Sequence, residues 1–225
     1  SSSINAVELW LYKVFPYLFI MIIINDTLIN LDFERVFKNT SIYVLVMSLL
    51  SGSPTSAVII SNLYKQGKIS ENNANITLMF TYFANPLFLY TMLNSTFNSF
   101  NVTIKLMIIH YLSNIIIYLI FKKKILYTPT VTNNTKFDIA GSIKKAMTTT
   151  TMVLGAITFY LVISDILQLN IFLRGLLEMT QGLNALIGRD LFAKEILAII
   201  FLSFGGLSVH TQVKCILDET DLKYK

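Results

Sequence analysis

The sequence contains few charged residues and one cysteine. Asp, Glu, Lys and Arg together make up 14% of its 225 residues, against roughly 25% in an ordinary soluble domain. By contrast, 54% of the residues are hydrophobic and the mean hydropathy is +0.61. This composition argues against a soluble enzyme and predicts an integral membrane protein. With Cys215 as its single cysteine, the chain cannot form an internal disulfide or a zinc site built on cysteines.

Motifs of catalytic sites are absent as well. The sequence has no G-x-x-x-x-G-K-[ST] phosphate loop, no H-E-x-x-H zinc motif and no Ser/His/Asp arrangement with a meaningful spacing. We therefore expect no enzymatic activity, no metal ion and no cofactor. The 18 basic residues exceed the 13 acidic ones. In a membrane protein this excess bears on orientation rather than on nucleic acid, which is not expected as a partner.

Long uncharged runs predict the membrane-spanning segments, since about 20 apolar residues cross a hydrocarbon core of roughly 30 Å. Spanning helices are expected over residues 9–31, 106–121 and 146–164. The longest uncharged run, 72–104, contains Asn85-Pro86, and a proline inside a helix removes a hydrogen bond, which predicts a kink or break there. Residues 171–195 carry too many charges to cross as a simple lipid-facing helix.

Two further uncharged runs are interrupted in the middle. Residues 41–64 are broken by Ser51-Gly52-Ser53-Pro54, which leaves two arms of about ten residues, each about 15 Å long as a helix. Such half-length arms predict a re-entrant hairpin, which is tolerated where protein or water satisfies the backbone of its tip. Residues 196–213 are broken by Gly205-Gly206-Leu207-Ser208. We expect both segments to enter and leave the membrane at the same face.

The interrupted runs also indicate an internal repeat. Residues 50–56 align with residues 204–210, and paired broken segments in the two halves of a chain are typical of a transporter binding site. The predicted organisation is one transmembrane domain, 1–225, with repeat one at 8–122, a basic loop at 122–145 and repeat two at 139–225. The loop carries six of the 18 Lys and Arg residues, which predicts that it faces the cytoplasm.

The helix breaks predict a solute site. A helix end leaves up to four N–H groups without intrahelical partners, and an unpaired polar group in hydrocarbon costs several kcal/mol. Water or a polar solute must therefore lie between the tips, and the positive helix ends favour an anion. Ser53 and Ser208 are expected to cap the second arms. The predicted solute-binding residues are Ser51, Gly52, Ser53, Pro54, Thr55, Asn85, Pro86, Glu178, Thr180, Gly205, Gly206, Ser208 and His210.

The ionisable residues in apolar segments have alternative interpretations. Glu178 either faces the site or forms an ion pair with Arg174, four residues earlier. His110 has no helix break beside it and is expected to be structural. Asp26 and Asp165 each close a spanning segment and are expected to be interfacial caps.

Five motifs, in this order along the chain, resemble the YlbJ family of sporulation integral membrane proteins, also called stage V sporulation protein V: SLLSGSPTSA, TYFANPLF, HYLSN, LLEMTQGL and FGGLSVHTQV. The family is placed in the nucleoside-recognition Gate-domain group. The resemblance implies a fold related to concentrative nucleoside transporters, with two inverted repeats that each contain a helical hairpin and a broken helix. It also implies a role in spore formation, where the family is linked to moving dipicolinate, a dianionic pyridine dicarboxylate, into the forespore.

The chain departs from the family pattern in three respects. It has Ser53-Pro54 where the family usually has Tyr-Pro, and Gln181 where the family usually has Asn. The family also continues past the position of Lys225 with a further membrane segment. Repeat two is therefore expected to lack its last element in this chain.

Together these features predict an all-α, polytopic membrane permease for a small polar, anionic solute. The alternative is a non-transporting membrane scaffold or signalling protein that recruits sporulation partners. Besides the lipid bilayer and the solute, a coupling cation and a second copy of the chain are partners that such a permease would use. The expected location is the bacterial cell membrane, as a multi-pass protein, and the resemblance points to the outer forespore membrane.

Overall fold

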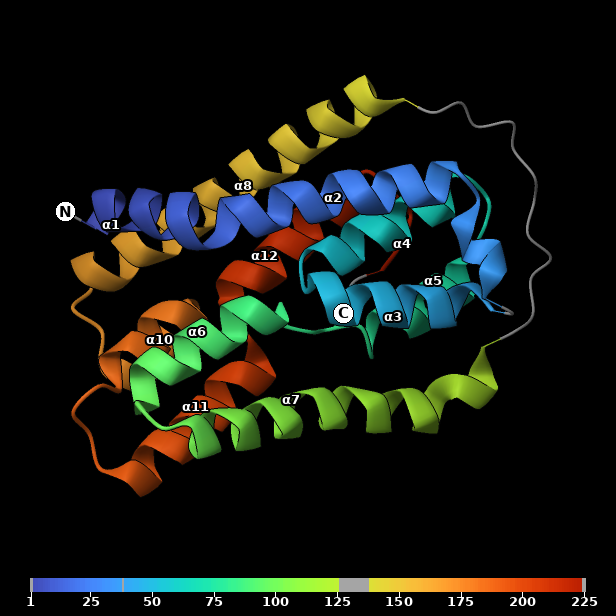
Figure 1. The fold of residues 1–225 in the computed structure, drawn as a ribbon. Helices are drawn as coiled ribbons and strands as arrows, with labels where there is room; N and C mark the ends of the chain where they lie inside the picture. The colour runs from blue at the N-terminus through green and yellow to red at the C-terminus, as the bar shows by residue number, and fades with distance from the viewer. Residues whose placement is uncertain (1, 38, 126–137, 224–225) are drawn as a thin grey trace.

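The computed structural model describes residues 2–37, 39–125 and 138–223, and within these ranges the chain forms helices joined by turns, with no strand. Four helical segments are long and apolar enough to cross a membrane. Figure 1 shows them running along the long direction of the molecule. The predictions of an all-α fold and of a multi-pass membrane protein are confirmed.

The first span contains a local distortion. It begins with α1 (Ser2–Leu9), passes through a π-helical turn, η1 (Trp10–Val14), and continues as α2 (Phe15–Asn30). Pro16 lies in the first turn of α2 and has no N–H to donate to the turn before it. The chain widens into η1 at this point, and single π-helical turns of this kind are frequent at functional sites.

The other spans are α7 (Phe100–Phe121), α8 (Ile139–Ile166) and the pair α11 (Leu191–Phe204) and α12 (Gly206–Leu217). A 3-10 turn, η3 (Lys122–Lys124), ends α7. Because α8 begins at Ile139, residues 139–145 of the predicted basic loop are helical, and this part of the prediction is wrong. Residues 126–137 of that loop lie outside the described residues.

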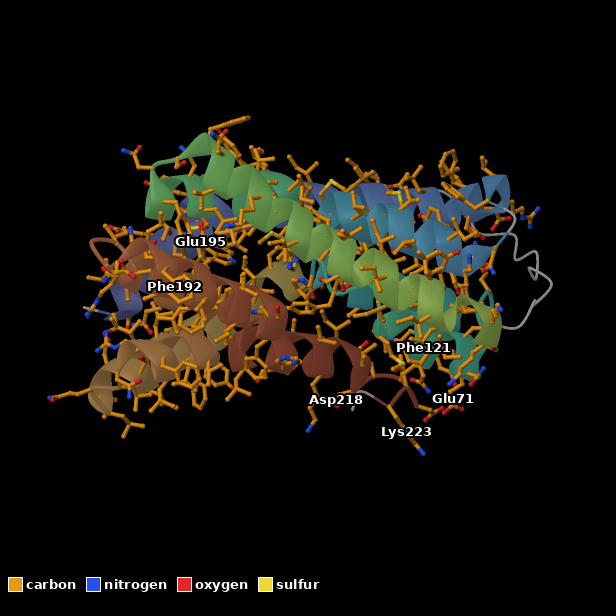
Figure 2. The ribbon with its side chains drawn as sticks, turned by 90° about the horizontal axis from the view of Figure 1, so that it is seen from below. Glu71, Phe121, Phe192, Glu195, Asp218 and Lys223 are labelled. Carbon is orange, nitrogen blue, oxygen red and sulfur yellow. The ribbon has the colours of Figure 1, made fainter. Side chains whose placement is uncertain are left out.

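The molecule has two ends along this direction. We name the end that carries η3 and the start of α8 the basic end, because Lys122, Lys123, Lys124, Lys144 and Lys145 lie there. Figure 2 shows Phe121 and Asp218 toward the basic end and Glu195 toward the opposite end. Within this frame α2 and α8 pack side by side, so the first and second halves of the chain share one core.

The hairpin predicted over 41–64 is confirmed. A 3-10 turn, η2 (Phe33–Val36), leads from α2 toward α3 (Thr40–Ser51), which packs side by side with α4 (Thr55–Lys65). At 1.5 Å per residue each arm is about 17 Å long, roughly half of a hydrocarbon core. Gly52 turns the chain with a φ of +76°, a value that glycine adopts without strain.

The break predicted at Asn85-Pro86 is also confirmed. α5 (Glu71–Leu78) ends well before α6 (Pro86–Phe97), and residues 81–85 between them are not helical. Asn85 caps α6, since its side-chain oxygen accepts hydrogen bonds from the backbone N–H groups of Leu87 and Phe88 at 3.0 and 3.1 Å. Pro86 takes the first helical position, where a missing N–H costs nothing.

A second, shorter hairpin occupies the charged region 171–195. α9 (Ile171–Leu177) and α10 (Met179–Ala185) pack side by side and meet at Glu178. The prediction that this region does not cross the membrane as one helix is confirmed.

The hairpin predicted over 196–213 is wrong. α11 and α12 follow one another as one interrupted span from Leu191 to Leu217, and they do not pack along each other as α3 and α4 do. One residue, Gly205, separates α11 from α12, whereas Gly52, Ser53 and Pro54 separate α3 from α4. A single residue leaves the chain no room to reverse its direction.

Candidate functional site

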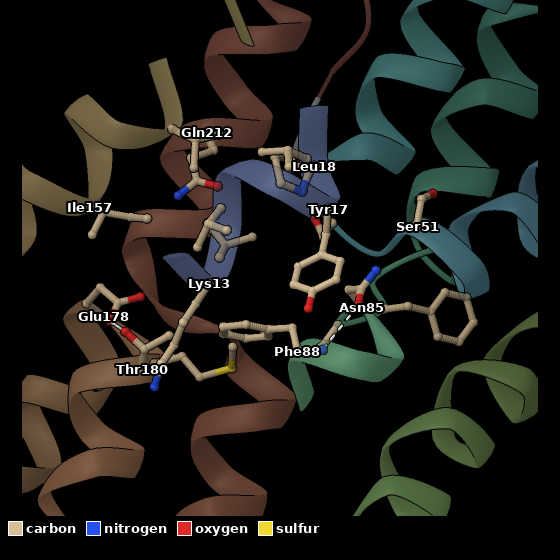
Figure 3. Close-up of a pocket in the computed structure, with 18 of the residues that line it drawn as sticks. Lys13, Tyr17, Leu18, Ser51, Asn85, Phe88, Ile157, Glu178, Thr180 and Gln212 are labelled. Carbon is tan, nitrogen blue, oxygen red and sulfur yellow. Dashed lines mark hydrogen bonds between the residues drawn. The ribbon is translucent and has the colours of Figure 1, made fainter. Parts of the chain in front are cut away.

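A cavity of about 90 Å³ lies where the helix breaks meet. Figure 3 shows that its walls come from different parts of the chain, with Lys13 and Tyr17 from the first span, Ser51 from the first hairpin, and Glu178 from the second. The described residues that line the cavity are Lys13, Val14, Tyr17, Leu18, Ser51, Ser53, Pro54, Tyr82, Phe83, Ala84, Asn85, Phe88, Val153, Ile157, Glu178, Met179, Thr180, Val209 and Gln212.

Glycines allow the breaks to approach each other. A Cβ atom on Gly52 would overlap the backbone of Asn85, so the first hairpin tip lies directly against the break before α6. A Cβ atom on Gly206 would lie 2.9 Å from the backbone nitrogen of Met179. The start of α12 therefore lies against the tip of the second hairpin. Gly205 lies against the Tyr82 hydroxyl in the same way, which joins the two pairs of breaks.

Polar side chains from α7 hold the non-helical segment before Asn85. The backbone N–H of Ala84 donates to Nε2 of His110 at 3.0 Å, and the Tyr111 hydroxyl donates to the Ala84 carbonyl at 2.9 Å. Asn85 in turn donates from its amide to the Leu50 carbonyl at 3.3 Å. His110 thus has the structural role expected for it, because it satisfies a backbone group that the break exposes.

Glu178 is 3% exposed and caps α10 at the cavity wall. Its carboxylate accepts from the backbone N–H of Gln181 at 2.9 Å and from the Thr180 hydroxyl. Arg174, the alternative partner, forms an ion pair with Asp165 instead, at 3.4 Å. In the described part of the chain the carboxylate of Glu178 makes no ion pair, so its charge is met by neutral donors at the wall of the cavity.

The hydroxyl groups at the first tip are arranged differently from the prediction. Ser51 donates to the Met47 carbonyl at 2.5 Å. Ser53 does not cap α4, because Pro54 takes the capping position and the backbone N–H of Ser53 is drawn to the Phe83 carbonyl at 2.6 Å. Within the described residues neither the Ser53 hydroxyl nor the buried Thr55 hydroxyl has a hydrogen-bond partner. Two polar groups at this tip are therefore left for water or a solute.

The residues predicted around the second break do not line the cavity. Ser208 is not a cap, since α12 already begins at Gly206 and Ser208 lies inside its first turn. The buried Ser208 hydroxyl accepts from the Gln212 amide at 3.1 Å, and Gln212 is the residue that reaches the cavity. His210 bonds the Phe204 carbonyl at 2.8 Å and stacks on Tyr82. It supports the break from outside the cavity.

Four polar residues of the cavity wall were missed by the sequence analysis: Lys13, Tyr17, Tyr82 and Gln212. Lys13 lies in the π-helical turn, and its ammonium contacts Sδ of Met92 at 3.9 Å. No carboxylate of the described residues forms an ion pair with it. A lysine inside an otherwise apolar run was a readable signal, because ionisable residues within spans usually face a site.

The expectation that Asp26 is an interfacial cap is wrong. Asp26 is 4% exposed and lies at the centre of a polar network that joins α2, α4 and α8. It accepts from Ser142 at 2.6 Å and from Asn62 at 3.0 Å, and it forms an ion pair with Lys145. Asp165, by contrast, is near the end of α8 and binds Arg174 and Ser2, as a residue at the membrane boundary would.

The fold and the cavity define the class of protein, an α-helical, multi-pass membrane protein with a polar cavity built at helix breaks. Over its whole length the chain is similar to a sporulation integral membrane protein, YlbJ of Bacillus subtilis strain 168. The two are 24% identical over 292 residues, which cover 100% of this chain and 72% of YlbJ. The resemblance indicated by the five motifs is confirmed. No family model matches the chain, and no solved structure matches it, so membership of the Gate-domain group stays a prediction.

Proposed function

We propose that this chain is a membrane permease that carries a small anionic solute through the cavity between the helix breaks. The observation that carries the proposal is a polar cavity enclosed by non-helical backbone from several spans. Irregular backbone at membrane depth is tolerated only where protein or a water-filled cavity satisfies it. A scaffold has no need for such breaks, whereas transporters place their binding sites at them.

The order of elements supports an inverted repeat of the kind found in concentrative nucleoside transporters. In each half a span (α2 or α8) is followed by a hairpin (α3–α4 or α9–α10) and then by a broken segment (α5–α6 or α11–α12). In this proposal the Ser51–Pro54 tip corresponds to the Glu178 tip, and Asn85 corresponds to Gly205. The alignment of residues 50–56 with 204–210 pairs a hairpin with a broken span, and we replace it.

An anion is the solute class that the charges favour. The helices α4, α6 and α12 all begin at breaks beside the cavity, and a helix start carries a partial positive charge. Lys13 adds a full positive charge to the wall. By resemblance to the YlbJ family the solute is dipicolinate, carried during sporulation at the outer forespore membrane.

Glu178 is the position at which a coupling cation would act. It is the one carboxylate among the described lining residues, and it has no ion-pair partner among them. A cation or proton bound there would offset the charge of an anionic solute held by Lys13. Assembly as a homo-oligomer stays a prediction.

Flux measurements with the full-length protein in proteoliposomes separate the permease from the scaffold. We expect the wild type to release internal radiolabelled dipicolinate above the rate of empty liposomes. Ser53→Leu, which places a large apolar group in the cavity, should lower this rate at least tenfold. Ser203→Leu, on the exposed face of α11, is the matched control and should not change it. A wild type that carries no dipicolinate, although it is folded, would favour the scaffold.

A further inference from the structure

A second, larger cavity of about 340 Å³ opens at the basic end of the molecule. It lies between α4, α8 and α12, and it is lined by the ammonium-bearing side chains of Lys65, Lys144 and Lys145 together with Thr148, Thr149 and Cys215. Neither the solute site nor the ion-pair network around Asp26 accounts for a space of this size.

The same helices line both cavities at successive turns. On α8, Val153 lines the central cavity and Thr149, one turn earlier, lines the second cavity. On α12, Gln212 lines the central cavity and Cys215, three residues later, lines the second. Since residues three or four apart lie on one face of a helix, the two cavities follow each other along the same groove toward the basic end.

Apolar side chains separate the two cavities. Val58 of α4, Met152 of α8 and Ile216 of α12 line the second cavity, and all three belong to a hydrophobic cluster that also contains Val153 and Ile157 of the central cavity wall. The cluster thus lies between the two spaces. A charged solute cannot cross these contacts unless the side chains separate.

The charge of the second cavity is positive. Lys65 binds Glu219 at 2.6 Å, and this ammonium lowers the pKa of the Glu219 carboxyl, so the pair is ionised and neutral overall. Lys145 is balanced by Asp26 behind the cavity wall. Among the described residues Lys144 makes no ion pair. One uncompensated positive charge remains, and hydroxyl groups of Thr148 and Thr149 lie beside it.

We propose that the second cavity is the vestibule through which the anionic solute reaches the central cavity from the basic end, and that the contact of Val58, Met152 and Ile216 is the closed gate between them. The inference rests on the permease function proposed above. Its ligand is a carboxylate or another small anion in solution, drawn by Lys144 and released when the gate opens. This places the access route between α4, α8 and α12.

Cys215 is exposed in the vestibule and serves as a built-in probe. We would measure its rate of reaction with an anionic and a cationic methanethiosulfonate of similar size, each relative to a free thiol in solution. The anionic reagent should be favoured at least about threefold, as expected near one uncompensated positive charge. Lys144→Gln should remove the preference, whereas Lys123→Gln, outside the vestibule, should keep it. Dipicolinate should slow the reaction.

A flux measurement completes the test. Attachment of a bulky maleimide to Cys215 from the basic side should stop dipicolinate flux, and Cys215→Ser should be insensitive to the reagent. If the labelled protein carries dipicolinate at the normal rate, the route lies elsewhere and the vestibule is wrong. If the anionic preference and the protection hold but the wild type carries nothing, the vestibule stands as an anion site and the permease function fails. Protection of Cys215 by phosphatidylglycerol in the liposomes, but not by dipicolinate, would assign the cavity to lipid head groups and overturn the proposal.

Discussion

Gly52 lies against the backbone of Asn85 so closely that a methyl group on Gly52 would overlap the nitrogen and Cα of Asn85. The contact joins the tip of the first hairpin to the break before α6. Two irregular segments that would each be costly in a membrane therefore cover one another, and the cavity wall depends on the absence of a side chain at this position.

Gly52→Ala should destabilise the protein more than a glycine substitution elsewhere with the same backbone strain. Gly67 is the matched control, since its φ of +69° is close to the +76° of Gly52 but no atom lies within 4 Å of the position that a Cβ atom would take. Gly67→Ala should cost about 1–2 kcal/mol from the left-handed conformation alone. Gly52→Ala should cost a further 1–3 kcal/mol or so from overlap. Thermal unfolding of the purified protein in detergent measures both, and equal melting temperatures would contradict the contact.

Lys13→Gln should lower the flux of dipicolinate by about tenfold, which corresponds to about 1.4 kcal/mol of lost anion binding. The physical reason is that Lys13 brings the one ammonium group to the described wall of the central cavity. Lys13→Arg keeps the charge and should retain most of the flux. Lys214→Gln, an exposed lysine on α12 outside both cavities, is the control. The neutral diamide of the same pyridine should be carried poorly by the wild type and should not distinguish the variants.

Lys145→Gln should destabilise the fold by leaving the carboxylate of Asp26 buried without a cation. Because Lys145 itself is partly exposed, we expect a loss of about 1–3 kcal/mol, below the range for a fully buried pair. Asp26→Asn in the same chain should recover part of the loss, since the amide can still bond Ser142 and Asn62. A double-mutant cycle on melting temperatures in detergent measures the coupling. Strictly additive effects would show that the ion pair does not contribute.

The basic end should face the cytoplasm, because cytoplasmic segments of membrane proteins carry an excess of Lys and Arg. In a Cys215→Ser background, Lys123→Cys should react with a membrane-impermeant maleimide only after the cells are permeabilised. Arg189→Cys, at the opposite end between α10 and α11, should react in intact cells. The reverse pattern would invert the topology.

The spans and the first hairpin could be predicted because they depend on local features. An uncharged run of sufficient length, a Gly-Ser-Pro tip and a proline after an asparagine each specify an element through the backbone itself. Gly205-Gly206 could not be interpreted in this way, since the same residues suit a reversal of the chain and an interruption within one span. The number of residues between the helices and the contact of Gly206 with the second hairpin decide the outcome.

The site was predicted in part for a similar reason. Ser53, Asn85 and Glu178 could be named because each stands at a helix end. Ser208 and His210 stand beside Gly205 as well, yet the rotation of α12 turns Val209 and Gln212 toward the cavity instead. That rotation is set by packing against α8 and α4, which the sequence does not reveal. The partners of Asp26 were equally hidden, because Lys145 lies far along the chain.

During synthesis Asp26 leaves the ribosome 119 residues before Lys145. Until α8 has been inserted, α2 must remain beside the translocation machinery or hold an uncompensated acid, since a lone carboxylate within a span is costly. The ion pair can therefore act as a checkpoint in biogenesis, at which the second half of the protein releases the first into the bilayer. A nascent chain stopped before α8 would be recognisable to membrane proteases as unfinished.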